Sequence, residues 1–336
     1  AAFTGINNLV SGNGGTTYTT GNIATTGNQT YWDLLQVNAN STLDAGAGTI
    51  ALQNTATIDD GRTLVLDAAT INTQAIAGTV GGGTSNVTFN TAGVATVSGA
   101  LDTEIDVTIL ARTVDVRSNN FDITTLTNNG VFRLTGLQAV QDVTTMTMVP
   151  GVVQYYDGGA DGDILIARFY TLEIPATVAA ARRFTLGQDI VVGPVAGGGE
   201  VRIANGILDA DAAPNSRTIT LYGNWTNTTA DNSHFEPQEG TVEFAKPSGV
   251  ITILGNNRWY IFWCTIPGIV IQFESQKTQE MVSYGSPRFH VQGSAWGANE
   301  IWLEATLAYT IAPPPAPPPA GNTHWIFDVD VNLLLE

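Results

Sequence analysis

The sequence predicts an all-β protein built as a parallel β-helix, or β-solenoid, and three observations lead to this prediction. Short runs with an apolar residue at every second position recur roughly every 8 to 12 residues. The chain of 336 residues contains 36 Gly and 14 Pro and is rich in Thr and Asn, a mixture that favours strands and turns. No long window has helical apolar spacing, and the nearest candidate, ATVAAARRF, is too short to predict a helix.

Residues 1–150 form a Thr/Asn/Gly-rich part in which alternation is dense. The alternating pairs are Leu64 and Leu66, Val87 and Phe89, Val107 and Ile109, and Val114 and Val116. A sandwich would use many tight hairpins, but Asn-Gly and Asp-Gly dipeptides are few in this part. Strand–turn units follow one another without a break, which favours stacked coils of about 20–25 residues, on the order of 14 coils for the chain.

Residues 151–311 are expected to be a β-strand-repeat portion that continues the same solenoid. Two stretches, Gly151–Ile174 and Gly240–Ile266, have similar patterns: Gly, alternating Val and aromatic residues, a polar loop, and an Ile-rich return. Matching them places Cys264 opposite Leu172 and Ile266 opposite Ile174. We therefore predict that Phe262, Cys264 and Ile266 point inward and that the single cysteine is a small buried hydrophobic residue.

The C-terminal part is read as two further segments. Residues 312–321, APPPAPPPAG, are a polyproline linker or loop, because proline lacks the N–H needed in a strand ladder. Residues 322–336 form a predicted C-terminal strand. This strand completes either the last coil of its own subunit or the sheet of a neighbouring subunit.

Charge excludes several classes of partner. The formal net charge is −17, from 13 basic and 30 acidic residues, so binding to nucleic acid or to an anionic membrane surface is not expected. No run approaches 18 apolar residues, so no transmembrane helix is expected. The first residues, AAFTGINN, are typical of a mature form after signal-peptide removal, or of an excised fragment, and with a single Cys they favour an exported protein at the cell surface.

A family resemblance supports this interpretation. The segment RTITLYGNWTNTTADNSHFEPQEGTVEF resembles the strand repeats of large secreted bacterial surface proteins, and residues 21–52 resemble filamentous-haemagglutinin-like and autotransporter-like repeats. Cys264 departs from the usual Leu of the last strand. The positions that keep the pattern are Gly223, Asn224, Trp225, Thr226, Asn227, Phe235, Pro237, Gly240, Val242, Phe244 and Ile266. The resemblance implies an extracellular β-solenoid with a structural or binding role.

Candidate chemistry is sparse. Asp157, Asp161 and Asp163 lie in a glycine loop whose hard oxygen ligands suit Ca²⁺, although the twelve-residue calcium-loop pattern is absent and a solvated turn is the alternative. No other cofactor is expected. His234, His290 and His324 have no partner at zinc-ligand spacing.

Carboxylates near basic residues raise the alternative of a carbohydrate-active lyase or hydrolase. The two candidate groups are Asp106, Asp115 and Arg117, and Asp209, Asp211 and Arg202. Outward positions of a strand also have to be polar in any solenoid, so we expect no enzyme activity.

Candidate subunit contacts lie in the aromatic cluster and in the tail. Outward Trp259 or Trp263 would pack on a neighbouring subunit, on a sugar, or under a loop of their own chain. In the tail the candidates are Trp325, Phe327, Val329, Val331 and Leu333.

Three functions follow from these observations. The first is a non-enzymatic structural protein, assembled head to tail into an extracellular filament or sheath by stacking of solenoid ends. The second is an adhesin or spacer segment of a larger surface protein, with host or environmental glycans as partners. The third is a carbohydrate-active β-helix enzyme.

Overall fold

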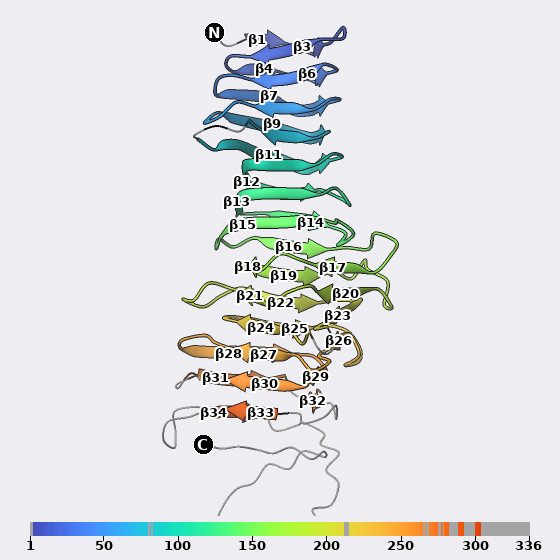
Figure 1. Ribbon diagram of the computed structural model, residues 1–336, viewed down its shortest axis with the longest axis vertical. Coiled ribbons are helices and arrows are strands. Elements are labelled where there is room, and N and C mark those ends of the chain that lie inside the picture. The colour runs from blue at the N-terminus through green and yellow to red at the C-terminus, as the bar shows by residue number, and fades with distance from the viewer. Residues whose placement is uncertain are drawn as a thin grey trace, which may run out of the picture. The chain divides into compact units, whose positions relative to one another are not determined.

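The computed structural model confirms the predicted fold class. It describes residues 3–79, 81, 83–211, 215–264, 266, 269–274, 277, 279–281, 288–291 and 300–303. In these ranges the regular structure is entirely β-strand, with no helix, and stacked parallel strands form a β-solenoid of about 12 turns (Figure 1). The predicted segments 312–321 and 322–336 lie outside the described residues.

The chain divides into two compact units, Ala1–Thr171 and Leu172–Glu336. In the first unit each coil contributes strands to three parallel columns, and the longest strands turn corners and serve two or, in one case, all three of them. The first column contains β1 (Phe3–Ile6), β4 (Ile23–Thr25), β7 (Ser41–Leu52), β9 (Thr63–Thr73), β11 (Ser85–Val97), β12 (Leu101–Asp115), β13 (Phe121–Asn128) and β15 (Gln141–Thr147).

The other two columns of the first unit use shorter strands. The second contains β2 (Leu9–Ser11), β5 (Gln29–Tyr31), the later halves of β7, β9, β11 and β12, then β14 (Val131–Leu134) and β16 (Val152–Tyr155). The third contains β3 (Thr16–Thr19), β6 (Leu34–Val37), β8 (Ala56–Ile58), β10 (Ile76–Gly78) and the first residues of β12, β13 and β15. Two short strands, β17 (Gly162–Ile164) and β18 (Arg168–Phe169), end the unit.

Strict register explains the core of the first unit. Leu43, Leu66, Phe89 and Ile109 are successive register partners, and all four are fully buried. Because side chains alternate along a strand, the residues that follow these four positions point outward, as in the register row Asp44, Asp67 and Asn90. Each such buried side chain stabilises the fold by about 1.5–3 kcal/mol relative to leaving it exposed.

The second unit repeats the three-column plan. One column contains β19 (Thr171–Ile174), β22 (Glu200–Ile203), β25 (Asn224–Asn227), β28 (Gly249–Leu254), β31 (Ile269–Phe273) and β34 (Glu300–Leu303). Another contains β21 (Ile190–Val192), β24 (Thr218–Leu221), β27 (Thr241–Phe244), β30 (Ile261–Cys264) and β33 (Arg288–Val291). The third side has β20 (Arg183–Leu186), β23 (Ile207–Asp209) and β26 (Phe235–Glu236), followed by the pair β29 (Asn257–Trp259) and β32 (Gln279–Met281).

The corner between β28 and β29 requires glycine. Gly255 has φ of 82°, in the left-handed region, and a Cβ there would lie 1.7 Å from the Asn227 carbonyl oxygen. Its N–H donates to Glu274 Oε2 at 2.7 Å. Only glycine allows the chain to pass so close to the coil below.

Candidate functional site

The aromatic stretch that the sequence analysis singled out lies mainly in the core. Phe262 and Cys264 are fully buried, as predicted, while Ile266 is half-buried. Burial raises the pKa of the Cys264 thiol to about 11. Cys264 is therefore a packing residue in this environment, because thiol chemistry requires the thiolate.

Trp259 was expected as a possible surface contact, and this expectation was wrong. It is 1% exposed and packs against Trp225 and Phe262 with ring centroids 5.1 and 5.4 Å apart. The reason is a corner at Tyr260 between β29 and β30, which interrupts the alternation and turns both Trp259 and Phe262 inward. Trp263 alternates with Phe262 and is half-buried.

Side-chain amides accept hydrogen bonds from the two indole N–H groups in this core. Trp225 Nε1 donates to Asn257 Oδ1 at 2.7 Å, and Trp259 Nε1 donates to Gln279 Oε1 at 3.0 Å. Asn257 is itself fully buried and donates to the Gly255 carbonyl at 3.0 Å. A tryptophan is tolerated inside because its polar N–H has a partner.

The proposed match between Cys264 and Leu172 is also wrong, although both side chains are buried. Leu172 lies in β19, which pairs with β22, whereas Cys264 lies in β30, which pairs with β27. The two stretches are thus out of phase around the coil. Similar alternation arises because each column of a solenoid presents the same period-2 pattern.

The loop that contains Asp157, Asp161 and Asp163 begins with a turn closed by a side-chain hydrogen bond. Asp157 Oδ1 accepts the Gly159 N–H at 2.8 Å, and the Asp163 N–H donates to the Gly136 carbonyl at 2.8 Å. Among the described residues, no group of three or more His, Cys, Asp or Glu is arranged to hold a metal ion. Calcium binding by Asp157, Asp161 and Asp163 therefore remains a prediction that no cluster supports.

One carboxylate group expected from sequence is reorganised by the fold. Asp209 is paired with Arg183 rather than with Arg202. Arg183 also forms a bidentate pair with Glu236, with Nη1–Oε2 and Nη2–Oε1 distances of 2.5 and 2.9 Å. Arg183 therefore joins three successive strands, and hydrogen bonding to Glu236 holds its pKa above the ordinary value.

The remaining members of that group form separate pairs. Arg202 contacts Glu200 and Glu173 at 2.6 and 3.4 Å. Arg217 Nε lies 3.7 Å from Asp211 Oδ2. Of these pairs, only Arg202 with Glu173 joins neighbouring coils, because Glu200 lies in the same strand as Arg202. The fold therefore does not gather the predicted Asp209–Asp211–Arg202 group.

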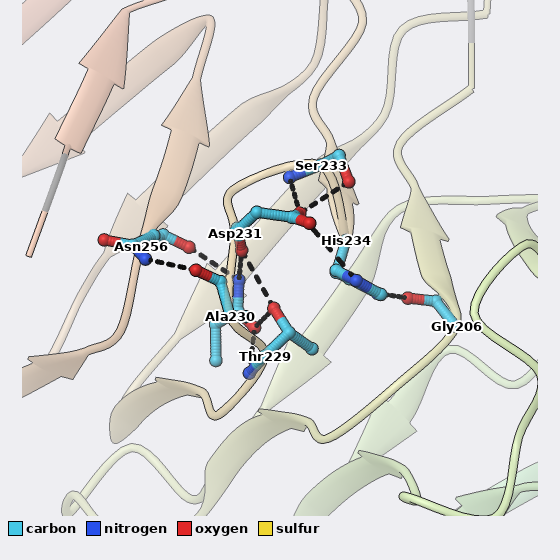
Figure 2. A network of polar contacts seen from close by, with 8 residues as sticks. Gly206, Thr229, Ala230, Asp231, Ser233, His234 and Asn256 are labelled. Carbon is cyan, nitrogen blue, oxygen red and sulfur yellow. Dashed lines mark hydrogen bonds and ion pairs between the residues drawn. The ribbon is translucent and has the colours of Figure 1, made fainter.

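A polar network fixes the loop between β25 and β26 (Figure 2). His234 Nδ1 donates to the Gly206 carbonyl at 2.5 Å, and His234 Nε2 lies 3.8 Å from Asp231 Oδ1. The Ser233 hydroxyl donates to the same Asp231 oxygen at 2.6 Å, and this bond lowers the pKa of Asp231. Because the hydroxyl bonds the carboxylate and not the imidazole, these residues do not form a nucleophilic triad.

Asparagines of the family-like motif anchor the same loop. Asn227 is buried; its Oδ1 accepts the Thr229 N–H at 3.0 Å and its Nδ2 donates to the Asn256 carbonyl at 2.6 Å. Asn256 Nδ2 in turn donates to the Ala230 carbonyl at 2.9 Å (Figure 2). The motif residue is therefore a connector between coils.

The other carboxylate group is split between two columns. Asp106 is the register partner of Asn86 and Thr125, whereas Asp115 lies beyond the bend of β12 opposite Arg133. Asp115 Oδ1 accepts the Tyr156 hydroxyl at 2.9 Å and the Arg117 N–H at 2.9 Å. Sequence analysis missed Arg133 and Tyr156, because Tyr156 is 41 residues from Asp115 and no local pattern links them.

Comparison with protein-family models, with curated proteins and with solved structures gave no match. The resemblance to secreted surface repeats therefore remains an expectation from sequence. In the part of the chain that the structure describes, no helix has the length and apolar character needed to cross a membrane.

Proposed function

We propose that this chain is a non-enzymatic structural protein whose solenoid coils stack end to end into an extracellular filament or sheath. The observation that carries the proposal is the one-sided pairing of the first coil. Among the described strands, β1 pairs with β4, β2 with β5 and β3 with β6, and none of the three has a partner on its other edge. Such an edge is a template for another strand.

The direction of the backbone groups in β2 can be assigned. The Leu9 N–H donates to the Asn28 carbonyl, and the Ser11 carbonyl accepts the Trp32 N–H, so both residues bond toward β5. Successive residues of a strand direct their backbone groups to opposite sides. The N–H and C=O of Val10 therefore point to the open edge.

Hydrogen bonds within the chain fix the conformation of the first coil. The N–H groups of Gly14 and Gly15 donate to Asp33 Oδ1 at 2.8 and 3.1 Å, and the Asn13 N–H donates to the same carboxylate. Because this turn is fixed to the second coil, pairing at the edge costs little additional ordering.

Exposed apolar side chains accompany the open edge. Val10, Tyr18 and Trp32 are 67%, 64% and 59% exposed, and all lie in the first two coils. Large apolar groups left in water favour contact with another surface, and the edge strands make a second copy of this chain the fitting partner.

The experiment blocks the edge without disturbing the fold. Val10→Pro removes the one N–H of β2 that points away from β5, so the thermal unfolding midpoint is expected to stay within a few degrees. We expect filaments of the parent chain in negative-stain microscopy at high concentration, and single particles for Val10→Pro. The matched control, Val10→Thr, keeps the N–H and the branched side chain and should still assemble.

Two outcomes would contradict the proposal. One is a parent chain that stays as single particles at every concentration tested. The other is a Val10→Pro variant that assembles as well as Val10→Thr.

An adhesin or spacer role is the second candidate, and exposed Tyr18 and Trp32 favour it. Flat aromatic rings also suit contact with a sugar. Under this alternative Trp32→Ala weakens glycan binding, while Val10→Pro has no effect on it.

A further inference from the structure

A cluster on the outer face of the first unit contains an arginine that forms no ion pair with a carboxylate among the described residues. Asp115 in β12, Arg133 in β14 and Gln154 in β16 are register partners in one row across three successive strands. Tyr156 follows β16 and reaches back to Asp115 across the intervening coil. The row thus carries an acid, a cation and an amide, and the Tyr156 hydroxyl bonds to the acid.

Arg133 packs against the aromatic ring of Tyr156 and does not pair with an acidic side chain in the part of the chain that the structure describes. Its guanidinium carbon lies 4.3 Å from the centroid of the Tyr156 ring. Its Nε is buried and has no hydrogen-bond partner, and no ion pair with a described residue is formed. Among the described residues, the guanidinium of Arg133 therefore contacts the Tyr156 ring and forms an ion pair with no carboxylate.

One carboxylate oxygen of the neighbouring Asp115 already accepts hydrogen bonds. Asp115 Oδ1 accepts both the Tyr156 hydroxyl and the Arg117 N–H, whereas Oδ2 accepts no hydrogen bond from a described residue. These bonds fix the phenol ring and, through it, the plane of the guanidinium. Arg117 is exposed on the same edge. The cluster is therefore a preorganised pair of a cationic donor and an anionic acceptor.

We propose that this cluster binds a uronic acid unit of an acidic polysaccharide. The terminal nitrogens of Arg133 receive the sugar carboxylate in a bidentate pair, Arg117 adds positive charge, and Asp115 Oδ2 accepts a ring hydroxyl of the same sugar. The inference does not depend on end-to-end assembly, because the cluster lies on a lateral face.

A uronate fits this surface better than a phosphate or a nucleic acid. The overall negative charge repels a nucleic acid duplex, which carries one negative charge per about 1.7 Å of its axis. Asp115, beside Arg133, would repel a phosphate dianion, but it favours a monoanion that also carries hydroxyl groups. Burial beside Asp115 raises the pKa of Tyr156 to about 12, so the phenol stays a donor at neutral pH.

The test measures binding of galacturonate oligosaccharides to the full chain by calorimetry, with fully methyl-esterified oligosaccharides as the neutral ligand. We expect binding of the acid form only, weakened about tenfold or more by Arg133→Gln, which corresponds to the loss of a charge-assisted bidentate pair. Arg62→Gln removes the same charge from an exposed position of the same unit and should bind like the parent.

Further variants keep the test decisive. Arg133→Lys keeps the charge without the planar fork and should give an intermediate affinity. Circular dichroism and the unfolding midpoint of each variant exclude a misfolded chain. The proposal is overturned if the parent binds neither form or binds both equally, if Arg62→Gln and Arg133→Gln behave alike, or if inorganic phosphate competes as well as monomeric galacturonate.

Discussion

At the scale of single residues, the position of a side chain relative to a corner decides its role. Trp259 is buried because the chain turns at Tyr260, so a residue that strict alternation would place outside enters the core. Cys264 is also buried, with 1% of its surface exposed. The surplus of aromatic residues in this stretch therefore fills the interior of the second unit.

The burial of Cys264 predicts an unreactive thiol. With a pKa near 11, very little thiolate exists at pH 8, so labelling by a disulfide reagent should proceed only as fast as the protein unfolds. Absorbance of the released thiolate measures this, with the urea-denatured chain as the fully reactive control. Complete labelling of the native protein within minutes would contradict the burial.

The raised pKa of Cys264 also makes the stability of the fold depend on pH. The pKa in the folded state is raised above the unfolded value of 9.0, so the folded state binds the thiol proton more tightly. The resulting stability is fully present below pH 9 and is lost as pH rises toward 11.

At the scale of elements, charged pairs act as connections between coils. Arg183 joins Asp209 and Glu236, and Arg258 Nε pairs with Glu280 Oε2 at 3.0 Å on the same kind of outer face. Each pair links strands of one column that are distant in sequence. The most buried of these carboxylates is Asp209, which is 7% exposed and therefore depends most on its partner.

We expect Arg183→Met to lower the free energy of unfolding by about 1–3 kcal/mol, because Asp209 is left buried without its cation. The comparison is Arg202→Met, whose partners are more exposed, with an expected loss of about 0–1 kcal/mol. Urea denaturation measures both.

A second substitution tests the cause. Adding Asp209→Asn to Arg183→Met removes the buried charge and should recover part of the loss. Equal losses for Arg183→Met and Arg202→Met, or no recovery in the double variant, would show that the Arg183 network does not stabilise the stacked strands.

At the scale of the whole molecule, net charge opposes association. Copies of a chain with net charge −17 repel one another, and this repulsion is screened over about 30 Å at 0.01 M salt but about 8 Å at 0.15 M. End-to-end pairing through backbone groups and apolar contacts is much less sensitive to salt.

We therefore expect assembly, followed by light scattering, to increase as sodium chloride rises from about 10 to about 150 mM. Val10→Pro should scatter little at either concentration and serves as the control for non-specific aggregation. Assembly that weakens as salt rises would indicate that ionic contacts drive it, contrary to the strand-edge proposal.

The sequence by itself determined the fold class and the inward face of most strands. Alternation has a period of two residues and is written locally, so the burial of Phe89, Phe262 and Cys264 follows from their neighbours alone. Turn-rich composition without helical spacing predicted an all-β fold, and the scarcity of hairpin dipeptides favoured a parallel solenoid over a sandwich.

Only the tertiary structure decided which side chains meet. Arg183 and Glu236 are 53 residues apart, and Asp115 and Tyr156 are 41 apart. These side-chain contacts depend on the number of residues in each coil, which differs from turn to turn. They also depend on where each corner interrupts the alternation of side chains. Coil lengths and corners are set by packing of one coil on the next, because a single coil buries its apolar face only against its neighbours.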